Sequence, residues 1–371
     1  MHKPVSCAIL LMSFLCGDVL ANGYPLGIDR KKHGESIAND MNAAGQVAAV
    51  IKDPDGTPHG IYFEKGKLVR LEAPGESASE ANRINSHGDI VGSVKKANGW
   101  RAILSHQGKE TQELGTLGGE NSHGMALNNH GQAVGFADLA DDSWHAFLYT
   151  PGEKMKDLGT LGGRISYAVA INDAAQVVGT AMDTEGYRHA FLYTPDRGMR
   201  DLGTLGGRFS YASAINRQGM VAGASEMKDR RIHAFVYDGR QMVDLGAKIG
   251  YGNSFATGIN DEGHVVGVVD LEDIRLLFVW RDNKMILHPS GKSLYLTNAI
   301  NNAGQVIGAI YDRGLEAATM PSNERPFVDH GGDKIFGFNL VMILLAATVV
   351  IFRKRFKGLF FNMSPYVREK Y

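Results

Sequence analysis

The chain has 371 residues with 39 Lys and Arg against 40 Asp and Glu, a formal net charge of −1. It therefore lacks the basic surplus of a nucleic-acid-binding protein, and no nucleic-acid partner is expected. Its two cysteines, Cys7 and Cys16, both lie in the first 21 residues. If that segment is removed, disulfide bonds, thiolate metal sites and a cysteine nucleophile are excluded.

Residues 1–21 predict a signal peptide. Met1–Lys3 provides a short positive start, Val5–Cys16 is apolar, and Val19–Ala21 supplies the small residues of a cleavage site. A lipoprotein signal is the alternative, but the bulky Leu15 argues against it. We therefore expect export of the chain that begins at residue 22.

Residues 22–334 contain a repeated unit. The run Asp157–Pro195 begins again at Asp201, and self-similarity at a period of about 44 residues indicates a repeat architecture. A hydrophobic residue followed by Asn recurs in every copy of the unit. The seven asparagines of this tag are Asn42, Asn85, Asn128, Asn172, Asn216, Asn260 and Asn301.

Each unit predicts four short strands. In the copy around Asn172 these are Tyr167–Ile171, Gln176–Ala181, His189–Thr194 and Met199–Gly203, separated by Gly, Pro, Asn and Asp clusters. Four strands in about 44 residues match one propeller blade. We predict an all-β fold, a seven-bladed β-propeller of four-stranded repeats. An open β-solenoid is the structural alternative.

The N-terminal segment Tyr24–Asp29 resembles the fourth strand of a unit, because its Leu-Gly step matches Leu245–Gly246. The last unit, by contrast, lacks a fourth strand and is expected to leave the ring through a third strand near Phe327. The N-terminal strand would then complete the last blade and cover both sheet edges. Alternatively, Pro326–Val328 supplies that strand from within the unit.

Ile335–Phe352 carries no charged residue and, as a helix, would span about 27 Å, enough for a bilayer core. Arg353–Arg355 follow directly, and a basic cluster marks the cytoplasmic side. A buried core helix is the alternative, but the repeats have ended here. We predict a single-pass cell-envelope protein with a periplasmic or extracellular repeat domain and a basic cytoplasmic tail, 353–371.

The Asp-Leu-Gly-Thr-Leu-Gly-Gly run, the Asn tag and a His-Ala-Phe triplet together resemble the HAF family of extracellular repeat proteins. The triplet stands at His145–Phe147, His189–Phe191 and His233–Phe235, and is lost in units one, two and six. The resemblance implies an exported, propeller-like protein and no particular reaction.

The repeated polar residues favour structural roles. Asn suits the turn between strands one and two, since it tolerates left-handed backbone angles and bonds nearby amides. The Gly pairs could suggest a phosphate cradle, but no helix or Lys-Ser/Thr follows them, so crossovers between blades are favoured. The triplet histidines could approach a metal, although hydrogen bonds between blades explain them more simply. Acidic loops lack a fixed calcium-ligand spacing. No metal, cofactor or catalytic residue is therefore predicted.

The crossovers and the loops after strand two meet at one end of the ring, which we expect to face away from the membrane. Loops on a rigid scaffold commonly carry binding sites. The predicted ligand-binding residues are Arg164, Tyr167, Arg208, Tyr211, Asp142, Asp183 and Asp270. The predicted function is a membrane-anchored binding or scaffold module for a protein or polysaccharide. The alternative is a propeller hydrolase or lyase with an axial or top-face active site.

Overall fold

The computed structural model describes residues 24–25, 35–72, 76–248, 252–271, 274–289, 294–300, 302, 304, 306–311 and 315–320. The predicted signal peptide (1–21), membrane helix (335–352) and cytoplasmic tail lie outside these residues. In the part of the chain that is described, the only helix is the 3-10 turn η1, Gly246–Lys248, and no helix is long and apolar enough to cross a membrane.

Twenty-eight strands follow one another in repeats. Repeat one holds β2 (Glu35–Met41), β3 (Val47–Lys52), β4 (Pro58–Glu64) and β5 (Lys67–Arg70). Repeat two holds β6 (Ser79–Ile84), β7 (Asp89–Lys96), β8 (Gly99–His106) and β9 (Glu110–Gly115). Repeat three holds β10 (Ser122–Leu127), β11 (Ala133–Asp138), β12 (Trp144–Tyr149) and β13 (Lys156–Asp157). Repeat four holds β14 (Gly162–Ile171), β15 (Val177–Asp183), β16 (Arg188–Thr194) and β17 (Gly198–Asp201).

The later repeats keep this order. Repeat five holds β18 (Gly206–Ile215), β19 (Val221–Met227), β20 (Ile232–Tyr237) and β21 (Met242–Asp244). Repeat six holds β22 (Asn253–Ile259), β23 (Val265–Leu271), β24 (Ile274–Arg281) and β25 (Lys284–Pro289). The last repeat holds β26 (Leu294–Ile300), β27 (Val306–Tyr311) and β28 (Leu315–Met320), and it pairs with β1 (Tyr24–Pro25).

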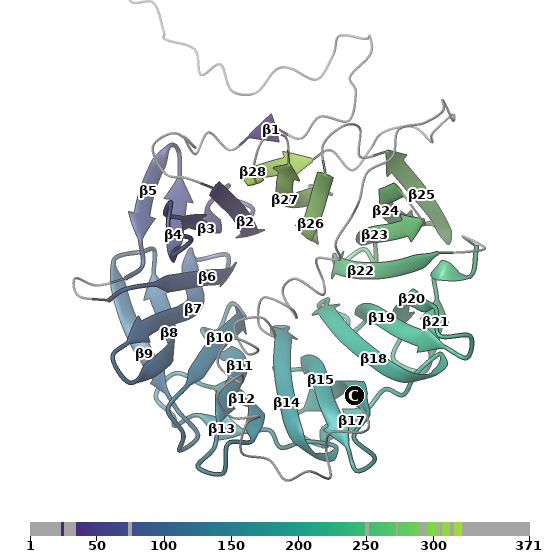
Figure 1. Cartoon of the computed structure of the whole chain (residues 1–371), viewed down its shortest axis with the longest axis horizontal. Helices are drawn as coiled ribbons and strands as arrows, with labels where there is room; N and C mark the ends of the chain where they lie inside the picture. The colour runs from purple at the N-terminus through teal and green to yellow at the C-terminus, as the bar shows by residue number, and fades with distance from the viewer. Residues whose placement is uncertain are drawn as a thin grey trace, which may run out of the picture.

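The sheets stand around a central opening, so the predicted all-β propeller is confirmed (Figure 1). The prediction of seven separate blades is wrong. The described strands form six sheets, five of four strands and one of eight. The eight-stranded sheet holds β10–β17, because Trp144 of β12 forms a parallel bridge to Ile165 of β14.

The N-terminal strand closes the ring, as predicted. β1 pairs antiparallel with β28, Tyr24 opposite Thr319, and takes the fourth place in the last sheet (Figure 1). The expected third strand near Phe327 is misplaced, since β28 ends at Met320. The alternative strand Pro326–Val328 lies outside the described residues.

The core lies between neighbouring sheets, because each second strand is covered on both faces. All six residues of β11 are buried, and the last triplet residues Phe147, Phe191 and Phe235 are fully buried. The Gly seven residues after the tag, which repeat one replaces by Ala49, has a packing role. A Cβ on Gly179 would collide with the carbonyl oxygen of Tyr167 and with the ring of Phe191.

Candidate functional site

The tag asparagines connect successive repeats. Asn172 Oδ1 accepts hydrogen bonds from the amides of Ala174 and Gln176, both at 3.1 Å, and Nδ2 donates to the carbonyl of Asn216 at 3.0 Å. The same bond to the next tag recurs from Asn42, Asn85, Asn128 and Asn216. The prediction that the tag asparagines hydrogen-bond to nearby backbone amides is therefore confirmed. The left-handed angle, however, falls three residues later, for example at Gly219 with φ 80°.

A buried serine forms the second joint between repeats. Ser166 Oγ accepts from the Ala146 amide of the preceding repeat at 2.8 Å and donates to the Gly159 carbonyl. Ser122, Ser210 and Ser254 accept from the preceding repeat in the same way. Because Ser166 donates its hydroxyl proton to a carbonyl oxygen, this serine holds the fold rather than acting as a nucleophile.

The triplet histidines pair with aspartate inside their own repeat, not between blades as expected. The distances from Nδ1 to a carboxylate oxygen are 2.9 Å for His145–Asp157, 2.8 Å for His189–Asp201 and 2.9 Å for His233–Asp244. Each pair ties the third strand to the end of the fourth. Among the described residues no group of three or more His, Cys, Asp or Glu could hold a metal ion.

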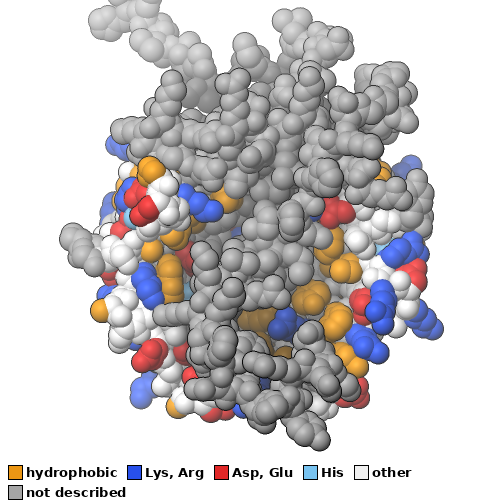
Figure 2. Space-filling view, viewed as in Figure 1, with side chains coloured by type: hydrophobic (Ala, Val, Ile, Leu, Met, Phe, Trp, Pro, Cys, Tyr) orange, Lys and Arg blue, Asp and Glu red, His pale blue; other side chains and the backbone are white. Residues whose placement is uncertain are grey.

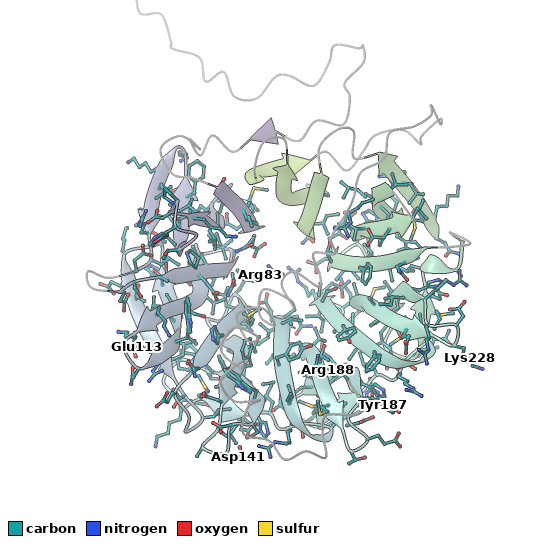
Figure 3. All side chains as sticks on the ribbon, viewed as in Figure 1. Arg83, Glu113, Asp141, Tyr187, Arg188 and Lys228 are labelled. Carbon is teal, nitrogen blue, oxygen red and sulfur yellow. The ribbon has the colours of Figure 1, made fainter. Side chains whose placement is uncertain are left out.

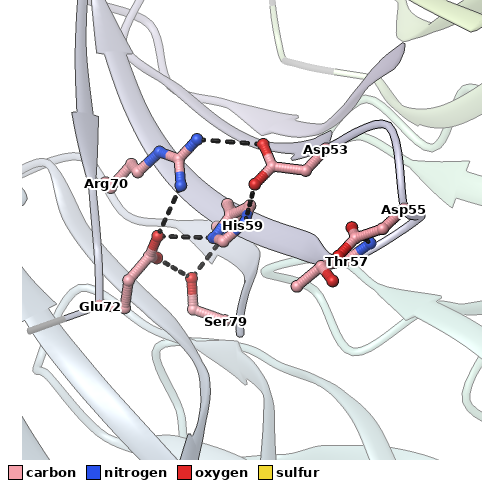
Figure 4. A network of polar contacts seen from close by, with 8 residues as sticks. Asp53, Asp55, Thr57, His59, Arg70, Glu72 and Ser79 are labelled. Atoms are coloured by element: carbon pink, nitrogen blue, oxygen red, sulfur yellow. Dashed lines mark hydrogen bonds and ion pairs between the residues drawn. The ribbon is translucent and has the colours of Figure 1, made fainter. Parts of the chain in front are cut away.

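Repeat one replaces this pair by a larger network (Figure 4). His59 Nδ1 lies 2.7 Å from Glu72 Oε1, and Nε2 lies 2.9 Å from Asp53 Oδ2. Arg70 contacts both carboxylates, and the Ser79 hydroxyl donates to Glu72 while accepting from the Gly60 amide. The network therefore also joins repeat one to repeat two.

A cavity of about 190 Å³ lies where the first strands converge. In repeats one to six, the residue two positions before the tag asparagine lines this cavity. In repeats one and two this residue is charged, Asp40 and Arg83 (Figure 3). In repeats three to six it is small: Ala126, Ala170, Ala214 and Gly258. Arg83 Nη1 donates to the carbonyls of Asn39 and Asn82 at 3.2 and 3.1 Å.

Loss of water around Asp40 raises the pKa of its carboxyl, although Arg83 and the amides of Ile84 and Met41 oppose the rise. Figure 2 shows hydrophobic side chains on the part of this face that β14 and β18 occupy in Figure 1. The cavity therefore has a mixed polar and apolar lining with one acidic and one basic group.

A third polar cluster lies between repeats four and five, at the end of the ring where the first strands begin, here called the crossover end. It comprises Tyr167 of β14, Thr180 of β15, Arg188 of β16 and Tyr211 of β18. Loss of water raises the pKa of Tyr167 to about 12 and also raises the pKa of Tyr211, and the Arg188 guanidinium opposes both shifts. Arg188 therefore lies within electrostatic reach of both phenols.

Of the predicted ligand-binding residues, the structure brings Tyr167 and Tyr211 together at this cluster. Arg208 is nearby, with its guanidinium 5.5 Å from the centroid of the Tyr187 ring, and its amide donates to Glu226 at 2.6 Å. Sequence reasoning missed Arg188 itself. The sequence does mark Arg188, because a cation stands there directly before the His-Ala-Phe triplet, where repeat three has Trp144.

The other predicted residues are dispersed over the ring. Arg164 donates to the carbonyl of Asp141 at 2.7 Å, and Asp142 occupies a turn with φ 62°. Asp183 caps the loop after β15 by accepting the amides of Glu185 and Tyr187 at 2.9 and 2.8 Å. Asp270 pairs with Arg275. These carboxylates do not converge on one site.

No protein-family model and no curated protein matches the chain. Solved structures do match. The β-propeller domain of the Trilobed protease from Pyrococcus furiosus aligns with TM-score 0.56 and 13% identity over 79% of this chain and 97% of that one. Streptogramin B lyase aligns with TM-score 0.51 and 13% identity, covering 81% and 97%. Puromycin hydrolase aligns with TM-score 0.57 and 12% identity over 78% of this chain but only 52% of its own length. At these identities the likeness shows the fold: the chain forms a β-propeller.

Proposed function

We propose that the protein is a binding or scaffold module whose ligand docks on the crossover end of the ring. The observation that carries the proposal is the cluster of Tyr167, Arg188 and Tyr211, with Arg208 and Tyr187 beside it. These side chains gather on a rigid scaffold, whereas the repeated Asn, Ser and His-Asp sets are engaged in joints within and between repeats. A polysaccharide is the ligand class that we favour, and a protein partner is the alternative outcome.

The orientation of the ring supports docking on the crossover end. Met320, the last described residue of β28, pairs with Val306 at the start of β27, so the chain leaves the propeller at the end that carries the Asn turns. If residues 1–21 are a signal peptide and Ile335–Phe352 spans the membrane, the Asn turns face the bilayer and the crossover end faces away. The domain bounds 22–334 and membership of the HAF family belong to the same proposal.

A hydrolase or lyase is the second candidate. The axial cavity favours it, because Asp40 and Arg83 place an acid with a raised pKa and a cation at one pocket. Perturbed carboxyl groups in pockets are common at catalytic sites. Release of reducing ends or of unsaturated sugars, lost in Asp40→Asn, would support this candidate.

The test uses the full chain in detergent micelles and beads bearing pectate, alginate, dextran or cellulose. Retention of the wild type on at least one polysaccharide, without product release, is expected. Charge reversal of Arg164 and Arg208 at the crossover end should reduce retention, because both are exposed to a docking ligand. Reversal of Arg217, on an Asn turn, should not. Loss of retention only in the Arg217 variant would place the ligand on the wrong end and refute the proposal.

A further inference from the structure

The axial cavity is built from the same short stretch of every repeat. All of its described lining residues belong to the last three positions of the first strands β2, β6, β10, β14, β18, β22 and β26. Each of these strands carries a β-bulge directly before the residue that lies two positions ahead of its tag asparagine. A bulge re-aims the side chain beside it. The fold therefore repeats one backbone device around the axis and varies the side chain that follows it.

Two neighbouring repeats place opposite charges at this device. Asp40 follows the bulge in repeat one and Arg83 follows it in repeat two, so both charges lie on the same side of the cavity. The Arg83 guanidinium acts electrostatically on the Asp40 carboxyl. Within the part of the chain that the structure describes, the two side chains nevertheless form no ion pair. An acid and a base that are close but not in contact suit a ligand that carries both charges.

Both groups keep bonding capacity that the fold does not use. Asp40 accepts the amides of Met41 and Ile84 at 2.9 and 3.1 Å, one at each carboxylate oxygen. A carboxylate has about four lone-pair sites, so Asp40 can accept further donors. Arg83 donates to two backbone carbonyls through Nη1 alone, and its Nε and Nη2 donate to no residue that the structure describes. Because loss of water raises the pKa of Asp40, its ionised form gains from an added cation.

The rest of the lining indicates the size and the character of the ligand. The cavity volume of about 190 Å³ exceeds the roughly 150 Å³ of a cavity that admits benzene, so a ligand of about six to nine non-hydrogen atoms fits. The residues directly before the tag asparagines supply aliphatic side chains. Those that line the cavity are Leu127, Ile171, Ile215, Ile259 and Ile300. A few polar groups that fix orientation within an otherwise aliphatic set are typical of small-molecule sites.

We infer that the axial cavity binds a free aliphatic α-amino acid. Arg83 binds its carboxylate through Nε and Nη2, since adjacent guanidinium donors match the two oxygens of a carboxylate. Asp40 binds its ammonium group, and the aliphatic residues contact its side chain. An aliphatic acid alone would leave Asp40 without a cation, and an aliphatic amine alone would leave Arg83 without an anion. This site goes beyond the docking proposed for the crossover end, because the two sites use different residues.

The experiment measures calorimetric binding to the full chain in detergent micelles. The ligands are L-leucine, 4-methylpentanoate, which lacks the ammonium group, and 3-methylbutylamine, which lacks the carboxylate. L-leucine should bind the wild type roughly 10- to 100-fold more tightly than either analogue, because hydrogen bonds to charged groups contribute that much. This comparison uses only the wild type, so it does not depend on the folding of a variant.

Alanine variants identify which residue binds which charge. Repeats three, four and five carry Ala at this position, so the bulge accommodates Asp40→Ala and Arg83→Ala. In Asp40→Ala, L-leucine and 4-methylpentanoate should bind equally, because the ammonium group has lost its partner. In Arg83→Ala, L-leucine and 3-methylbutylamine should bind equally. Glu153→Ala and Arg197→Ala, which remove an exposed acid and an exposed base from outer turns, are the matched controls and should bind L-leucine as the wild type does.

Three results would overturn the amino-acid site. They are no binding of L-leucine to the wild type, equal binding of L-leucine and either analogue by the wild type, and an unchanged preference for L-leucine in both Asp40→Ala and Arg83→Ala. The bead assay reports on the crossover end separately. Polysaccharide retention that still depends on Arg164 and Arg208 would therefore leave the proposed docking standing when the axial site fails.

Discussion

Replacing Asn172 by Ala tests the joint that every tag makes with the next repeat. The side chain is 6% exposed and makes four hydrogen bonds. It accepts from the amides of Ala174 and Gln176, and it donates to Gln176 Oε1 at 2.7 Å and to the Asn216 carbonyl at 3.0 Å. The substitution removes all four bonds and leaves buried backbone groups without partners.

The expected loss follows from the number of bonds. At about 1 kcal/mol of net stability for each hydrogen bond, Asn172→Ala should lower the free energy of unfolding by about 4 kcal/mol. Asn172→Asp separates the two halves of the joint, because it retains both acceptors but loses both donors. It also places a carboxylate against the Asn216 carbonyl, so its loss should be at least about 2 kcal/mol.

The assay is urea unfolding of the full chain, followed by the fluorescence of its three tryptophans, Trp100, Trp144 and Trp280. Ala174→Ser is the control, since Ala174 is exposed in the same turn and its change should cost less than about 0.5 kcal/mol. If Asn172→Ala unfolds within 1 kcal/mol of that control, the tag does not join the repeats energetically.

Three further predictions concern closure, pH and topology. Deleting Tyr24–Asp29 should lower the midpoint of thermal unfolding for the whole propeller, because β28 keeps β27 but loses β1 on its other edge, and an unchanged midpoint would contradict ring closure. The raised pKa of Asp40 means that the folded state holds this proton more tightly. The wild type should therefore lose stability relative to Asp40→Asn as the pH rises from 3.8, the ordinary pKa of aspartate, through the raised pKa of Asp40. Urea unfolding between pH 3 and 7 measures this difference in stability. A difference that does not change with pH would show that the pKa of Asp40 is not raised in the folded state. A reporter active only in the cytoplasm, fused after Tyr371, should give signal, and activity of a reporter that works only outside the cytoplasm would reverse the predicted orientation.

Local sequence signals predicted most of the fold. In repeat four, the predicted strands Gln176–Ala181 and His189–Thr194 correspond to β15 and β16, because turn residues bound the strands and the apolar positions mark the buried faces. The join of two repeats into one sheet could not be predicted, since it depends on the path of the crossover before Ile165. A backbone bridge between neighbouring repeats does not require a particular residue pattern, so the sequence does not predict it.

The candidate site was predictable only in part. Tyr167 and Tyr211 were found because they stand on the crossovers, whereas Arg188 lies in a strand that reads as structural. Arg188 stands out because its cross-strand neighbour is Met182 rather than a carboxylate. Which residue lies opposite Arg188 depends on the pairing register of the strands. Comparison of equivalent positions in repeats four and six would have revealed it, since Asp270 and Arg275 occupy the same two places.

The pairing of β1 with β28 also fixes the order in which the molecule can be completed. Ribosomal synthesis produces Tyr24 before any of the repeats, yet its partner Thr319 appears only with the third strand of the last repeat. Hairpins within a repeat can form as they emerge, because their strands follow one another directly along the chain, while the amino-terminal strand must stay unpaired until the end. Closure of so long a loop is a slow, non-local step. Until closure occurs, the growing ring has two open edges to which strands of neighbouring chains could add. Pairing of the two-residue strand β1 is the step that ends this exposure.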